Sequence, residues 1–168
     1  MGRQTNAILN TARGELYVWF SSRWDSNEIR FYRGRLARLL LPEPRNKSAS
    51  LENDFPRYRS EIVKFIDFFE ELGFSYAEHK VDRRMVINTF SDVIVAYWLS
   101  VGERYAVKLN ENDANGKYYD KFKALAEAMI KGDKSIKESS NIIDTLADEL
   151  AVTAATFETN ARQMGRQQ

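Results

Sequence analysis

Residues 61–73, Glu-Ile-Val-Lys-Phe-Ile-Asp-Phe-Phe-Glu-Glu-Leu-Gly, decide the fold. Their apolar residues recur every three or four positions, the spacing that gathers side chains on one face of an α-helix. Nine residues later, a second block from Asp82 to Trp98 repeats the pattern, and Asp82 is expected to cap its first turn. The first of these helices is expected to start at about Arg57 and to stop at Gly73. The two blocks therefore predict a pair of core helices.

The rest of the chain also has helical periodicity. No run alternates apolar and polar residues over the length of a strand, so a sheet is not expected. A length of 168 residues suits one domain with a substantial core. We expect an all-α, single-domain helical bundle of five or six helices. Besides the two core helices, the expected segments are helices over about 6–20, 25–40 and 117–131, the last closed by Gly132, and an exposed loop over 42–56.

The last segment has a different pattern. Its apolar residues lie seven apart, as in a helix with a narrow apolar seam. A long C-terminal helix over 133–168 is therefore expected, packed either on the helical core of residues 1–132 or on a partner. The seam consists of Ile136, Ile143, Leu150, Phe157 and Met164, of which Ile143, Leu150 and Phe157 are candidate partner-binding residues.

Charge is distributed unevenly along the chain. Residues 1–45 hold eight arginines, no lysine and four acids, whereas the whole chain has a net charge of only +1. Arginine favours planar, bidentate pairing with carboxylate or phosphate. The arginines either pair with the acidic remainder of the protein or contact nucleic acid, and Arg30, Arg33 and Arg38 are the candidate contact residues. On a helix these side chains point in several directions and form no single basic stripe.

Few residues offer catalytic chemistry. The chain has no cysteine and one histidine, His79, so thiolate chemistry and imidazole-based metal sites lack their ligands. Asp67, Glu70 and Glu71 have a spacing that can hold Mg²⁺ on one helical turn, but such clusters are more often solvated or paired with arginine. No phosphate-binding glycine loop occurs. We expect no catalytic, cofactor or metal site, and therefore no enzyme.

The chain is also expected to be cytoplasmic and free of membrane segments. Its longest apolar stretches, Leu39–Leu41 and Val93–Leu99, are far shorter than the roughly 18 residues that span a bilayer. The N-terminal region carries Arg13 and Glu15 where a signal peptide would need an uninterrupted apolar core.

Several motifs together resemble an uncharacterised bacterial and phage helical domain family. They are Trp24-x-Ser26 before an arginine-rich helix, Phe68-Phe-Glu-Glu-Leu-Gly73, Val81-Asp82, and Phe90 and Ile94 leading to Tyr97-Trp98. The resemblance covers roughly residues 19–130 and implies a helical fold without an assigned activity. Many members carry an N-terminal membrane helix. This chain departs from that pattern, because its first helix contains the charged residues Arg13 and Glu15.

These observations favour a non-enzymatic helical module for protein interaction or assembly. Its partner is another protein or a second copy of the chain, and an inhibitor of a host protein, of the kind phages encode, would have the same sequence features. Nucleic-acid binding through the arginine-rich N-terminal helices is the alternative.

Overall fold

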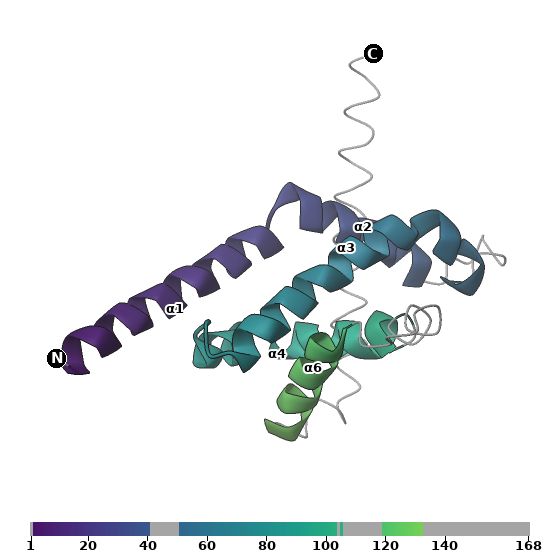
Figure 1. Cartoon of the computed structure of the whole chain (residues 1–168). Coiled ribbons are helices and arrows are strands. Elements are labelled where there is room, and N and C mark those ends of the chain that lie inside the picture. The colour runs from purple at the N-terminus through teal and green to yellow at the C-terminus, as the bar shows by residue number, and fades with distance from the viewer. Residues whose placement is uncertain (1, 41–50, 104, 106–118, 133–168) are drawn as a thin grey trace, which may run out of the picture.

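The described residues of the computed structural model, 2–40, 51–103, 105 and 119–132, are almost entirely helical (Figure 1). No strand occurs among them, which confirms the predicted all-α helical bundle. A π-helical turn, η1 (Trp98–Gly102), directly continues α4. The five helices are α1 (Gly2–Trp24), α2 (Asn27–Leu40), α3 (Leu51–Ala77), α4 (Arg83–Tyr97) and α6 (Asp120–Gly132).

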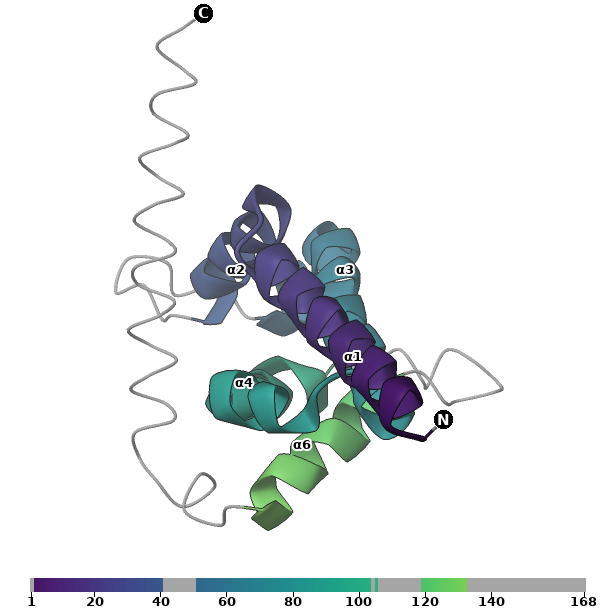
Figure 2. The same ribbon diagram turned by 90° about the vertical axis from the view of Figure 1, so that its left-hand side faces the viewer.

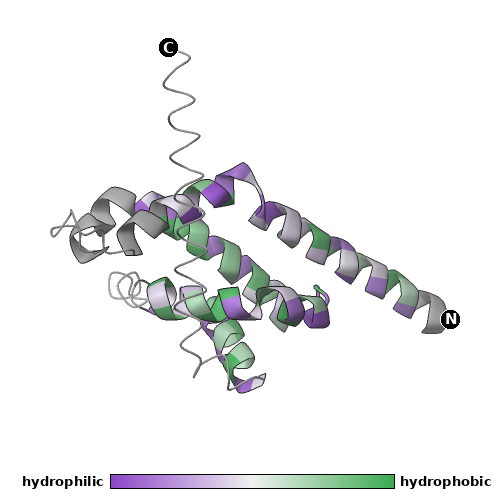
Figure 3. Ribbon diagram, turned by 180° about the vertical axis from the view of Figure 1, so that it is seen from behind, coloured by the Kyte–Doolittle hydropathy of each residue, from purple (hydrophilic) through white to green (hydrophobic). Residues whose placement is uncertain are grey.

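Helix α3 is the centre of the bundle, with α2 and α6 packed against it, and α4 packs against α6 (Figures 1 and 2). Hydrophobic residues are concentrated on α3, α4 and α6, whereas they alternate with hydrophilic residues along α1 (Figure 3). The N-terminal part of α1 extends beyond the other helices (Figure 1). One side of that helix is therefore left uncovered by the described bundle.

Aromatic side chains form much of the core. Trp24, the last residue of α1, lies among rings of α3 and α4. The Trp98 ring meets Phe122 of α6 edge to face at 5.1 Å, and Phe69 stacks on the same Phe122 at 4.6 Å. Edge-to-face packing of this kind adds about 0.5–1.5 kcal/mol per pair to the burial of the rings. The rings around Trp24 belong to Phe65, Phe68, Phe69, Phe90 and Tyr97, at 5.5 to 6.2 Å.

Gly73 does not end its helix, contrary to the prediction. Helix α3 continues to Ala77, and Gly73 is instead the point where α6 comes closest: a Cβ there would lie 2.7 Å from the carbonyl carbon of Lys121. The turn that ends the helix contains His79, whose φ of 55° is left-handed. The amide of Lys80 donates to Ser75 and that of His79 to Tyr76, which is the Schellman arrangement of a helix end.

Two helix starts also differ from the sequence prediction. Helix α2 begins at Asn27, and the hydroxyl of Ser26, rather than Asp25, accepts the amide of Ile29 at 3.3 Å. Helix α3 begins at Leu51, inside the segment expected to be a loop, and contains Pro56 in its second turn. Because proline has no amide hydrogen, this turn lacks one intrahelical hydrogen bond.

The predicted start of α4 is confirmed. The Asp82 carboxylate accepts the amide of Met85 at 3.1 Å, as an N-cap residue does. By length and composition alone, the stretch Arg83–Gly102 could cross a membrane, which differs from the sequence expectation. Half of its most apolar window is buried inside the bundle, as is common in a core helix.

The π-helical turn was not predicted. The Glu103 amide donates to the carbonyl of Trp98, five residues back. Gly102 lies against the Trp98 ring, and a Cβ on it would be 3.0 Å from Phe122. A glycine here leaves room for both rings. The predicted C-terminal helix over 133–168 lies outside the described residues.

Candidate functional site

The candidate arginines of α2 do not share one surface. Arg33 is only 8 % exposed, and its guanidinium carbon lies 4.2 Å from the centre of the Trp24 ring. Burial lowers the pKa of Arg33, although a guanidinium remains protonated at neutral pH. Burial likewise raises the pKa of Tyr97 to about 12. Arg33 is therefore part of the core, not of a partner-binding surface as the sequence hypothesis supposed.

The other candidate partner-binding residues have separate outcomes. Arg30 is exposed and lies 3.6 Å from the carboxylate of Asp25. The side chain of Arg38 lies outside the described part of α2. Arg23, at the end of α1, forms an ion pair with Glu71. Ile143, Leu150 and Phe157 lie outside the described residues, so the predicted C-terminal seam stays a prediction.

The three candidate metal ligands of α3, Asp67, Glu70 and Glu71, face different partners. Asp67 accepts the Tyr119 hydroxyl at 3.2 Å, and burial raises the pKa of that carboxyl. Glu70 accepts two backbone amides at the start of α6, that of Lys121 at 3.2 Å and that of Phe122 at 2.7 Å. Each of these carboxylates therefore has a structural partner of its own, and Glu71 is bound to Arg23.

A line of exposed side chains runs along the outer side of α1. Ile8 is 69 % exposed and Trp19 is 49 % exposed. Between them lie Ala12 and Glu15, both also exposed. These four residues, at steps of four, three and four, form what we call the α1 seam. Such spacing keeps side chains on one line of a helix, as in a coiled coil.

The opposite side of α1 faces the bundle. Phe20 is 2 % exposed, and Tyr17 shares a hydrogen bond of 2.8 Å with Thr89 of α4. Arg13 donates from Nε to the carbonyl of His79 at 2.8 Å. These contacts fix the rotation of α1 about its axis, so the α1 seam points away from the described bundle.

Trp19 is held in place although it is exposed. Its ring meets Phe20 edge to face at 4.8 Å, and the Arg23 guanidinium lies over it at 5.1 Å. Arg23 is in turn bound to Glu71 of α3. An anchored tryptophan loses little conformational freedom when a partner covers it, and tryptophan is enriched among residues that dominate binding energy.

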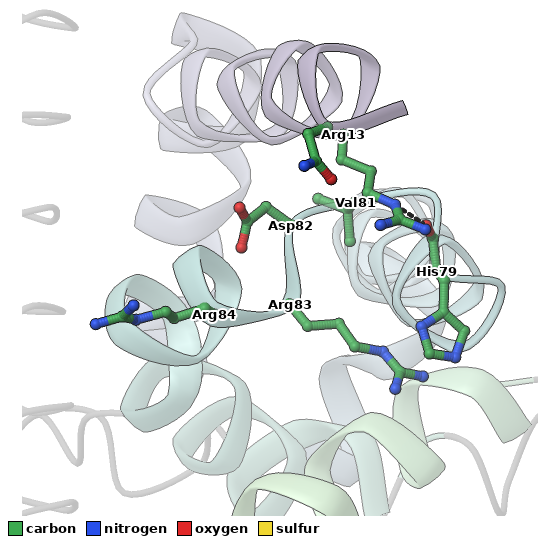
Figure 4. A pocket seen from close by; sticks show the side chains of 7 residues that line it. Arg13, His79, Val81, Asp82, Arg83 and Arg84 are labelled. Carbon is green, nitrogen blue, oxygen red and sulfur yellow. Dashed lines mark hydrogen bonds between the residues drawn. The ribbon is translucent and has the colours of Figure 1, made fainter. Parts of the chain in front are cut away.

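A polar pocket lies on the inner side of α1, where it crosses the turn between α3 and α4 (Figure 4). Its volume is about 230 Å³. Arg83 donates from Nε to the carbonyl of Tyr76 at 2.9 Å and covers the Tyr76 ring at 4.7 Å. The residues that line the pocket are Asn10, Arg13, His79, Val81, Asp82, Arg83 and Arg84.

Sequence reasoning missed both surfaces for identifiable reasons. Helical periodicity predicted the first helix but not which of its apolar residues face the core: of Ile8, Leu16, Trp19 and Phe20, only Phe20 is buried. The steps of four, three and four residues from Ile8 to Trp19 are the sequence signal that distinguishes this line from the apolar residues that face the core. No sequence signal joins the pocket residues, because α1 and the α3–α4 turn are distant along the chain.

Comparisons with protein-family models, with curated proteins and with solved structures find no significant match to this chain. The resemblance to the uncharacterised bacterial and phage family therefore stays a prediction.

Proposed function

We propose that this chain is a non-enzymatic assembly module, and that two copies associate through the α1 seam. The observation that carries the proposal is the exposed line from Ile8 to Trp19 on a helix that extends beyond the described bundle. Nucleic-acid binding has less support, because Arg33 is buried and Arg23 and Arg30 lie against carboxylates of the protein itself.

A second copy suits the α1 seam because the seam is symmetric about the middle of the helix. The midpoint of the seam falls between Arg13 and Gly14, and Ile8 and Trp19 lie at equal distances on either side of it. In an antiparallel pair related by a two-fold axis, Ile8 of each copy therefore meets Trp19 of the other. The same patch on both copies is the requirement for a closed dimer.

The centre of the α1 seam allows close approach. Ala12 of one copy falls in the same layer as Glu15 of the other, and the small alanine side chain leaves the longer glutamate room to extend to solvent. Each end is then closed by an apolar pair of isoleucine and tryptophan. This arrangement places one charged residue per copy in the middle of the α1 seam, with its carboxylate directed to solvent, and pairs the large apolar groups at the two ends.

The mass of the protein in solution tests this proposal. Light scattering during gel filtration should give twice the 19.5 kDa of the chain at high micromolar concentration. The double variant Ile8→Ser with Trp19→Ser should weaken association by at least about 2 kcal/mol, a roughly 30-fold rise in the dimer Kd. Circular dichroism should remain unchanged, because both side chains are exposed.

Val18→Ser is the matched control. Val18 is 58 % exposed, as apolar as Ile8, and lies about a quarter turn from the α1 seam at 100° per residue. It should leave the dimer intact. A monomeric wild-type protein would contradict the proposal. A dimer that survives the double variant but is lost in Leu150→Ser with Phe157→Ser would mean that assembly uses the C-terminal heptads instead.

A further inference from the structure

We infer that the pocket between α1 and the α3–α4 turn binds a small phosphate-type oxyanion. The inference does not depend on the α1 seam, which lies on the other side of that helix. Three arginines, Arg13, Arg83 and Arg84, line a space of about 230 Å³ together with Asp82. Arginine is therefore the main charged residue type around the pocket, in a chain whose overall net charge is only +1.

Two of the arginines are fixed by the end of α3. The Nε of Arg13 donates to the carbonyl of His79, and Arg83 donates from Nε to Tyr76 and from a terminal nitrogen to Ala77 at 3.4 Å. Arg83 also covers the Tyr76 ring. These bonds satisfy carbonyls that a helix end leaves open, and they hold the two side chains in position before any ligand arrives.

The terminal nitrogens of the fixed arginines supply the donors. Within the described residues, no protein acceptor is assigned to either terminal nitrogen of Arg13 or to one of those of Arg83. In Figure 4 the guanidinium groups of Arg13 and Arg83 lie on the same side as the His79 ring, whereas the Arg84 side chain points in the opposite direction, away from them. Forked N–H donors match the oxygens of a phosphoryl group.

The carboxylate of Asp82 would repel an anion, but it already accepts a hydrogen bond from the protein backbone. One of its carboxylate oxygens accepts the amide of Met85 at the start of α4. Its single negative charge leaves the positive charge of Arg13 and Arg83 in excess. The volume is below the roughly 300 Å³ at which sites for drug-sized ligands begin, which favours a small anion or the terminal group of a larger molecule.

His79 provides a direct probe, because it is the only histidine of the chain. Inorganic phosphate added to the full-length chain at constant ionic strength should shift the imidazole NMR resonances of His79 saturably, while chloride should not. Arg13→Gln and Arg83→Gln should each weaken phosphate binding by about tenfold or more, the loss of one charge-assisted hydrogen bond. Phenyl phosphate in place of phosphate tests whether the bound group belongs to a larger molecule.

Arg59→Gln is the control, because Arg59 is an exposed arginine in the N-terminal half of α3, far from the pocket. This variant should leave the phosphate-dependent shift of the His79 resonances unchanged. If one of the two pocket variants reduces folding, as seen by circular dichroism, the other decides. Equal shifts with chloride and phosphate, or an unchanged phosphate affinity in a folded Arg13→Gln or Arg83→Gln protein, would overturn the inference.

Discussion

At the scale of single residues, glycines and arginines have roles that their identity alone does not reveal. Gly73 allows two helices to touch, although glycine at that place in a sequence more often ends a helix. Arg33 is buried over Trp24 and stabilises the core as a cation against a ring. In both cases a distant residue decides the role, Lys121 in the first and Trp24 in the second.

Gly73→Ala should destabilise the fold. The added Cβ would meet the backbone of Lys121, which cannot move without shifting α6. We expect a loss of about 1–3 kcal/mol in the free energy of unfolding, the usual cost of overpacking. Urea denaturation followed by circular dichroism measures it.

Gly14→Ala is the matched substitution for this test. Gly14 lies inside α1, and nothing is within 4 Å of where its Cβ would be. Alanine there should stabilise the protein by roughly 0.5–1 kcal/mol, because it restricts the unfolded chain without a clash. If both substitutions changed the free energy of unfolding in the same direction, the close approach of α6 to Gly73 would be contradicted.

At the scale of helices, the core could be predicted from the sequence and the contacts at helix ends could not. Residues such as Phe65 and Phe69 lie on the apolar face that a period of 3.6 indicates, and both are fully buried. The start of α6, by contrast, is capped by Glu70 from another helix. A cap supplied from about fifty residues away leaves no local pattern, so only the folded chain reveals it.

The candidate site was harder to predict for a related reason. The first helix contains two apolar lines, and periodicity alone does not say which of them faces the core. The contacts of Tyr17 and Arg13 with α4 and the α3–α4 turn settle the orientation. Ile8 and Trp19 then fall on the side that faces away from the bundle.

Glu70→Ala should loosen the junction of α3 and α6. It removes the acceptor of the Lys121 and Phe122 amides, and we expect a loss of about 1–2 kcal/mol in the free energy of unfolding, as for other lost helix caps. Hydrogen exchange should rise first at those two amides. Glu127→Ala, an exposed change further along α6, should leave their exchange unaltered; equal effects of the two would argue against the cap.

At the scale of the whole molecule, the bundle presents two surfaces on opposite sides of α1. The inner side forms the arginine-lined pocket with the α3–α4 turn, and the outer side carries the α1 seam. Since the contacts of Tyr17 and Arg13 hold α1 against the bundle, pairing through the α1 seam needs no rearrangement of the core. Helix α1 is therefore both a wall of the pocket and the proposed interface.

Disulfide formation between two different single-cysteine variants tests the α1 pairing most directly, because the natural chain has no cysteine. Thr5 and Ser22 are both exposed and lie at equal distances from the midpoint of the α1 seam. In an antiparallel pair, Thr5→Cys of one copy lies beside Ser22→Cys of the other, while identical cysteines lie about 25 Å apart along the helix axis at 1.5 Å per residue. We expect the mixture to form the mixed disulfide efficiently and each variant alone to form little. Efficient homodimer cross-linking by each variant alone, without preference for the mixed species, would contradict antiparallel pairing through α1.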